Sequence, residues 1–214
     1  IIALPDSSKS SYIGLTGEHC ELTNIKVEET GQTMKNGDIE RIADVISYTD
    51  HLESDIPNIQ IDRTRSDATD GIEVEHKVKV QFHTMSLPGA NLVWHCPYVV
   101  LFGSEDGTVG GPNYHEYALI KLNGENDGSN YYAENRFIMK RKEDFPGWEE
   151  WKARNREGVE CELSVEKKGT RITMQAEETG IHIENITVLK DDKSKVYVAL
   201  TGDQVALTDI RVIR

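Results

Sequence analysis

One pattern occurs twice in this chain, at residues 12–27 and again at residues 197–212. The first copy reads YIGLTGEHCELTNIKV and the second reads YVALTGDQVALTDIRV. In each copy two short apolar-rich runs flank a turn that contains glycine, which is typical of a β-hairpin. We expect one domain in which the two hairpins are neighbouring or facing elements. The alternative is that the first copy closes a preceding domain.

Between the two copies, apolar and polar residues alternate with the period of a β-strand that buries one face. The residues from Lys77 to Phe82 are an example, because every second one is apolar. Residues 91–102 carry apolar side chains on both phases, so we expect a central strand that is covered on both faces. The predicted strands are residues 58–63, 77–82, 91–102, 114–122, 131–140, 159–165, 172–176 and 181–188.

Two of these strands carry a predicted irregularity. Pro97 has no backbone N–H, so it predicts a bulge or a local edge in its strand. In residues 181–188 the apolar residues change phase, since Ile181 and Ile183 lie on one face and Ile186 lies on the other. This change of phase predicts a β-bulge at Asn185.

Two short helices are predicted as well. Apolar residues recur at helical spacing in residues 38–46, behind the candidate N-cap Asp38. A second helix is predicted at residues 146–156, with Asp144 as its cap and Gly158 at its end. We expect its aromatic side chains to attach the helix to the strands; they are Phe145, Trp148 and Trp151.

Many short strands with few helices indicate an all-β fold, an antiparallel two-sheet sandwich of the jelly-roll or concanavalin-like kind with two short peripheral helices. We expect residues 1–214 to form one such domain. The first residues, Ile1 to Pro5, contain no initiator Met and no signal-peptide pattern, so the chain is expected to be part of a longer polypeptide.

Two resemblances follow from these patterns. Residues 12–15 with 24–27, and residues 197–200 with 209–212, resemble the closing strands of concanavalin A/laminin-G-like sandwiches, which include sugar-binding modules. The stretches LVWHCPY and LIKLNGEN resemble a domain found beside HD-type phosphohydrolase and other signalling modules in gut Firmicutes. The resemblance implies a bacterial accessory or sensory unit whose partners are neighbouring domains, and it transfers no functional residue.

The charge and the cysteines restrict the partners and the compartment. A net charge of -13 repels phosphate backbones, so nucleic acid is not expected as a partner. No apolar run approaches the ~18 residues of a membrane span. The three cysteines have no CxxC spacing, which argues against a disulfide framework or a zinc site. This favours a reducing compartment such as the cytoplasm, while a cell-surface location stays open.

Aromatic side chains beside polar ones are the pattern of sugar recognition, because a ring face stacks on a pyranose while polar groups bind its hydroxyls. Trp94 and His95 form the first choice, although core packing also explains a Trp in a strand. The predicted ligand-binding residues are Trp94, His95, Tyr117, Arg63, Asn135 and Arg136. Other candidates of the same kind are Tyr98, Tyr114, Tyr131, Tyr132, Arg65 and Asn126.

No catalytic signature is present. A glycoside hydrolase needs two carboxylates ~5–10 Å apart, and the candidates with suitable spacing also fit the polar face of a strand; they are Glu73, Glu75, Glu160, Glu162 and Glu166. Calcium is the one cofactor considered, in the acidic turns 67–70 and 125–127. The sequence therefore favours a non-catalytic module that binds a carbohydrate or other small polar ligand. The alternatives are a glycoside hydrolase of the same fold and a purely structural interaction domain.

Overall fold

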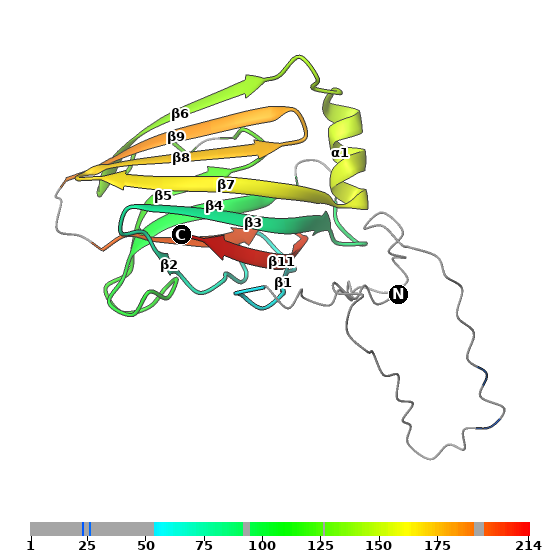
Figure 1. Ribbon diagram of the computed structural model, residues 1–214, viewed down its shortest axis with the longest axis horizontal. Helices are drawn as coiled ribbons and strands as arrows, with labels where there is room; N and C mark the ends of the chain where they lie inside the picture. Colours follow the sequence, from blue (N-terminus) through cyan, green and yellow to red (C-terminus); the bar gives the residue numbers. More distant parts are fainter. Residues whose placement is uncertain (1–22, 24–25, 27–53, 92–94, 126, 191–194) are drawn as a thin grey trace.

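The computed structural model describes residues 23, 26, 54–91, 95–125, 127–190 and 195–214, and within them the strands form two antiparallel sheets packed face to face (Figure 1). The large sheet has the strand order β1 (Ile59–Ile61), β11 (Val205–Ile213), β3 (Lys77–Ser86), β7 (Val159–Lys168), β8 (Arg171–Glu178), β9 (Ile181–Leu189), β6 (Ala133–Arg141). The small sheet has the order β2 (Ile72–Glu73), β10 (Tyr197–Gly202), β4 (Pro97–Gly103), β5 (His115–Lys121). The predicted all-β two-sheet sandwich is confirmed.

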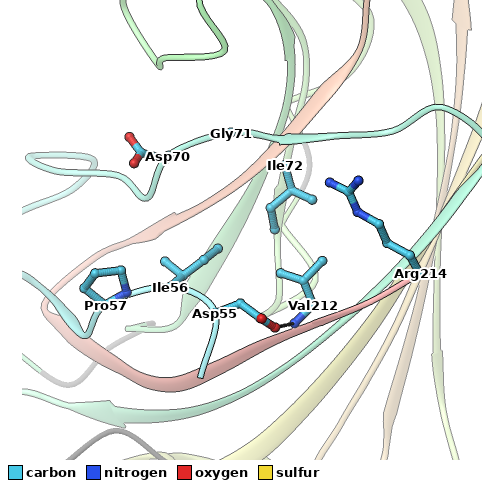
Figure 2. Close-up of a pocket in the computed structure, with 8 residues that line it drawn as sticks. All are labelled: Asp55, Ile56, Pro57, Asp70, Gly71, Ile72, Val212 and Arg214. Atoms are coloured by element: carbon cyan, nitrogen blue, oxygen red, sulfur yellow. Dashed lines mark hydrogen bonds between the residues drawn. The ribbon is translucent and has the colours of Figure 1, made fainter. Parts of the chain in front are cut away.

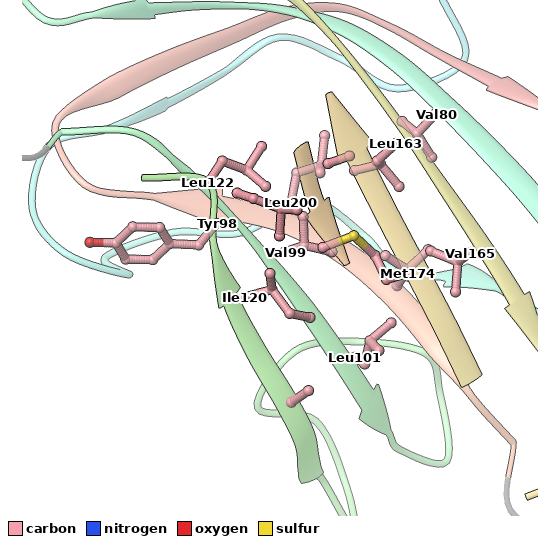
Figure 3. Packing of buried hydrophobic residues seen from close by; sticks show 14 of the residues in the cluster. Val80, Tyr98, Val99, Leu101, Ile120, Leu122, Leu163, Val165, Met174 and Leu200 are labelled. Carbon is pink, nitrogen blue, oxygen red and sulfur yellow. The ribbon is translucent and has the colours of Figure 1, made fainter. Parts of the chain in front are cut away.

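The core lies between the two sheets, where the inward-facing rows of alternating residues meet. Figure 3 shows Val99, Ile120 and Leu200 of the small sheet facing Leu163 and Met174 of the large sheet. All five side chains are buried. Each such burial contributes about 1.5–3 kcal/mol, so these rows fix which face of every strand points inward.

The small sheet also has a buried outer face, as expected for residues with apolar side chains on both phases. Val100, Phe102, Tyr197 and Ala199 form this second cluster, and Val109 packs on it from the loop between β4 and β5. A second covering loop passes close by, because the Gly71 N–H donates to the Gly107 carbonyl at 2.9 Å. A Cβ at Gly71 would lie 2.3 Å from that oxygen, so a side chain there would separate the two loops.

The second copy of the repeat contains two strands, but they do not pair with each other. β10 pairs with β2 and β4 in the small sheet, whereas β11 pairs with β1 and β3 in the large sheet. The expected hairpin is therefore wrong at residues 197–212, because the chain passes from one sheet to the other at Gly202. A Cβ at Gly202 would lie 2.6 Å from Val205 and 2.9 Å from the Cys96 carbonyl. The first copy lies outside the described residues apart from Thr23 and Lys26.

Neither predicted irregularity occurs where the sequence suggested it. β9 pairs without interruption with β6 and β8, so there is no bulge at Asn185. Asn185 and Thr187 instead occupy the inward phase, and Ile186 faces outward. Pro97 is the first residue of β4, where a missing N–H removes no interior ladder bond. The irregularity of β4 lies between Leu101 and Phe102.

The described helix, α1 (Trp148–Glu157), lies at one end of the sheets (Figure 1). Trp151 is fully buried, and its ring centroid lies 5.8 Å from that of Trp148. The expected attachment through aromatic residues is confirmed. Gly147, not Asp144, is the N-cap, and no side chain caps it. The other predicted helix, residues 38–46, lies outside the described residues, among which no helix is long and apolar enough to cross a membrane.

Candidate functional site

The predicted ligand-binding residues do not converge on one point. Trp94 lies outside the described residues. His95 is buried, and its Nδ1 lies 3.5 Å from a carboxylate oxygen of Asp203. Arg63 lies in the turn after β1, where its backbone N–H donates to the Ser66 hydroxyl. Neither His95 nor Arg63 is among the described residues that line the hollows discussed below.

Asn135 belongs to a polar cluster that joins the two sheets, which we call the polar staple and define as Asn130, Asn135, Asn185 and Thr187. The Asn135 side-chain oxygen accepts from Asn185 at 3.1 Å and from the Thr187 hydroxyl at 2.7 Å. Its amide donates across to the Tyr117 carbonyl of β5 at 2.8 Å. The Asn135 side chain therefore serves the fold, with both ends of its amide group engaged.

An aromatic cluster lies at the same edge of the sandwich. We call it the aromatic edge and define it as His115, Tyr117, Tyr131 and Tyr132. The His115 ring centroid lies 4.9 Å from Tyr117 and 5.0 Å from Tyr132, and Tyr131 meets Tyr132 edge to face at 5.2 Å. Tyr131 is 78% exposed and Tyr132 is 45% exposed, while Tyr117 is buried. Two ring faces are thus open to solvent on a pre-packed support.

Hydrogen bonds fix the orientation of His115. Its Nδ1–H donates to the Asn113 carbonyl at 2.9 Å, because a carbonyl can only accept. The Tyr117 hydroxyl then donates to Nε2 at 2.8 Å. Gly103 makes room for the pair, since a Cβ there would lie 2.6 Å from His115 Nε2 and 2.8 Å from the Tyr117 hydroxyl. The sequence pattern identified Tyr117 but missed His115.

A hollow of about 370 Å³ opens next to His115 and Tyr117. Glu105 and Lys195 are among its lining residues; the Lys195 amine pairs with Glu73 at 3.4 Å, and the Glu105 carboxylate accepts from the Asn113 amide. The lining residues are Gly103, Ser104, Glu105, Asn113, His115, Tyr117 and Lys195. Polar groups beside exposed ring faces are the combination that sugar recognition needs.

A larger hollow, of about 540 Å³, lies between β2 and the end of β11 (Figure 2). Ile56, Ile72 and Val212 face one another there, and the Val212 N–H donates to the Asp55 carboxylate at 2.6 Å. None of its described lining residues is aromatic. It therefore fits a stacked sugar less well than the aromatic edge does.

Of the carboxylates considered for hydrolysis, Glu160, Glu162 and Glu166 lie on the outer face of β7, whereas Glu73 belongs to β2 and Glu75 follows it. Glu162 pairs with Lys79 at 2.7 Å, and both that ion pair and a hydrogen bond from Gln81 lower the pKa of its carboxyl. Glu166 pairs with Lys168, and a hydrogen bond from this lysine lowers its pKa in the same way. These side chains line none of the hollows described above.

One carboxyl group has the opposite shift. Glu178 is 3% exposed, and burial raises its pKa to about 8. Its side chain points inward from β8 at the α1 end of the core and is buried there.

Metal binding has little support among the described residues, which contain no group of three or more His, Cys, Asp or Glu side chains placed to hold an ion. In the two acidic turns considered for calcium, the Asp127 carboxylate lies 3.0 Å from the Lys121 amine, and Asp67 accepts from the Ala68 N–H at 2.8 Å. Calcium binding stays a prediction.

Comparison with known proteins adds no functional information. No family model matches the chain, and no curated protein matches it. One solved structure, described as that of a functionally unknown protein from Saccharomyces cerevisiae, aligns with a TM-score of 0.25 and 7% identity. The alignment covers 73% of this chain and 86% of the other. A similarity at that level carries no argument about fold or function.

Proposed function

We propose that this sandwich is a non-catalytic module that binds a carbohydrate or other small polar ligand at the aromatic edge, as an accessory unit of a larger protein. The observation that carries the proposal is the exposed pair Tyr131 and Tyr132, which packs on His115 at the wall of a hollow. Adjacent exposed aromatic side chains often mark a binding surface, and a pyranose ring offers the C–H face that such rings bind.

The support beneath the two tyrosines favours recognition of a rigid ligand. His115 packs against Tyr132, and its own ring is held by Asn113 and Tyr117. The Lys190 amine lies 4.1 Å from the centroid of the Tyr131 ring, which orients that ring through a cation–π contact. Because the rings are held before the ligand arrives, little side-chain entropy is lost on binding.

A screen on a glycan array, followed by titration calorimetry with the best ligand, tests the proposal. Tyr131→Ala and Tyr132→Ala should each weaken binding about 5- to 10-fold, the loss expected for one stacked ring. Tyr131→Phe is the matched control, because it keeps the ring face and should bind within twofold of the wild type.

Two results would count against this function. If no glycan binds, the exposed tyrosines have another partner, and the structural interaction domain becomes the better interpretation. If a glycan binds but both Ala variants bind it as tightly as the wild type, the module recognises sugars at another surface.

A further inference from the structure

We propose that a second groove, on the outer face of the large sheet, binds the carboxylate of an acidic oligosaccharide. We call it the arginine groove and define it as Arg136, Arg171, Ile186 and Val188. It encloses about 480 Å³, and Glu134, Asn135 and Ser129 complete its wall. That the ligand is a saccharide rests on the proposed function. That the ligand is acidic rests on the groove alone.

Strand register brings the two arginines to opposite sides of β9. Arg136 on β6 is paired with Ile186, and Arg171 on β8 is paired with Val188, two residues further along β9. Two strand spacings and two residues separate their Cα atoms by ~12 Å. Two extended arginine side chains can therefore approach one small anion from both sides.

Among the described residues the two guanidinium groups have no ion-pair partner, unlike Lys79 and Lys168 on the same face. Lys79 pairs with Glu162, and Lys168 pairs with Glu166, both at 2.7 Å. Within the described part of the chain neither Arg136 nor Arg171 forms an ion pair. In a chain of net charge -13, two neighbouring arginines without ion pairs form a local positive site for an anionic group.

The floor of the groove explains why a saccharide is a better occupant than a free inorganic anion. Ile186 and Val188 face outward between the arginines, and Val188 is 40% exposed. Aliphatic side chains bind the C–H surface of a sugar ring, whereas they offer nothing to phosphate or sulfate. A guanidinium group meanwhile binds a carboxylate with two parallel hydrogen bonds.

The charge balance of the groove suits a ligand with few charges. Glu134 is paired with Val188 and stands in the same groove as the two arginines. Its carboxylate leaves one net positive charge at the site, which is enough to bind one carboxylate of the ligand.

The arginine groove and the aromatic edge are close enough to hold one short chain. Lys190, which contacts Tyr131, directly follows β9 and lies four residues after Ile186, or ~13 Å at the rise of an extended strand. A ligand that stacks on Tyr131 while its carboxylate reaches Arg136 must therefore contain more than one sugar unit.

Titration calorimetry with trigalacturonate and with neutral maltotriose tests the charge preference. Trigalacturonate should bind at least 10-fold more tightly than maltotriose. Arg136→Gln and Arg171→Gln should each weaken trigalacturonate binding about 10-fold or more, the loss expected for a charge-assisted hydrogen bond. Lys140→Gln is the matched control, because it removes one positive charge from the same face of β6 outside the groove.

Each outcome is decisive. Equal binding of both trisaccharides, or an equal loss with Lys140→Gln, would overturn the arginine groove but leave a sugar-binding aromatic edge in place. Failure of both trisaccharides to bind would overturn the groove, and the glycan array would then decide the proposed function separately. Competition by sodium sulfate at equal potency would show a simple anion site and also contradict the proposal.

Discussion

Two polar regions lie inside this sandwich, the polar staple on β6 and β9 and Glu178 on the neighbouring β8, and their hydrogen-bonding groups are satisfied to different degrees. In the polar staple, Asn185 donates to Asn135 at 3.1 Å and to Thr187 at 2.8 Å. At the α1 end, Glu178 is equally buried, but among the described residues no hydrogen bond of ordinary geometry reaches either of its carboxyl oxygens. An inward polar residue in this fold therefore either links strands through hydrogen bonds or, when it is a carboxyl without such bonds, lowers the stability of the fold once it ionises.

The surroundings of Glu178 explain why its proton stays bound. Burial is the main cause of the raised pKa, and the nearby amide of Asn155 lowers it only in part. Burial also raises the pKa of the thiols of Cys96 and Cys161, and the carboxyl of Glu178 adds to that rise. The α1 end of the core therefore favours neutral groups, whereas the polar staple contains no titratable side chain.

The largest expected effect is a pH dependence that belongs to the α1 end alone. The folded pKa of Glu178, about 8, lies above the ~4.3 of an unfolded chain, so the stability that protonation provides is complete at acid pH and is lost as pH rises toward 8. Glu178→Gln should remove this loss, so its free energy of unfolding at pH 9 should exceed that of the wild type by roughly 3–5 kcal/mol. Urea unfolding of both proteins at pH 5, 7 and 9 measures this difference.

Glu177→Gln is the control for that experiment. Glu177 is next to Glu178, but it is half exposed on the opposite face, where Lys142 and His182 lower the pKa of its carboxyl. This variant should keep the falling stability between pH 5 and pH 9. Parallel pH profiles for the wild type and Glu178→Gln would show that the carboxyl of Glu178 is hydrated in solution, and the contrast between the two regions would disappear.

A smaller, pH-independent effect is expected at the polar staple. Asn185→Ala removes two hydrogen bonds and leaves a small void, and it should lower the free energy of unfolding by about 2–3 kcal/mol. The loss should be the same at pH 5 and pH 9, because no partner titrates. A loss that grows with pH would mean that the two regions are coupled, and the same urea series would reveal this.

The smallest effect is expected for Thr187→Val, which keeps the shape of the side chain but removes its hydroxyl. That hydroxyl donates to Asn135 and accepts from Asn185, so the free energy of unfolding of the variant should fall by about 1 kcal/mol. Chemical denaturation of the single variants and of the double variant with Asn185→Ala gives the coupling energy. Strictly additive losses would contradict the description of the staple as one network.

Much of the fold could be predicted because strand patterns are local. The alternation in β7 and β8 depends on each residue's own polarity, and the structure places those strands where the sequence does. The covered faces of β4 were also predictable, since both phases are apolar. The candidate site was harder to predict from the sequence. Tyr131 and Tyr132 were recognised as aromatic candidates, but no local signal distinguished them from Trp94.

The errors have a common physical cause, which is that the deciding partners are distant in sequence. The change of phase in β9 suggested a bulge, because an inward Asn185 is unfavourable unless a partner binds it. That partner, Asn135, lies on another strand. The second copy of the repeat suggested a hairpin, because its turn is compact; pairing with β2, β4, β1 and β3 divided the two strands between the sheets.

The sequence by itself therefore determined where most strands lie and which phase of each strand is apolar. It also determined that a helix packs on the sandwich through aromatic side chains. Only the tertiary structure decided which sheet each strand joins, which polar side chains turn inward, and that Arg136 and Arg171 flank the same two aliphatic residues. The reason is that apolar burial depends mainly on the residue itself, whereas a hydrogen bond or a charged groove needs partners that only folding brings together.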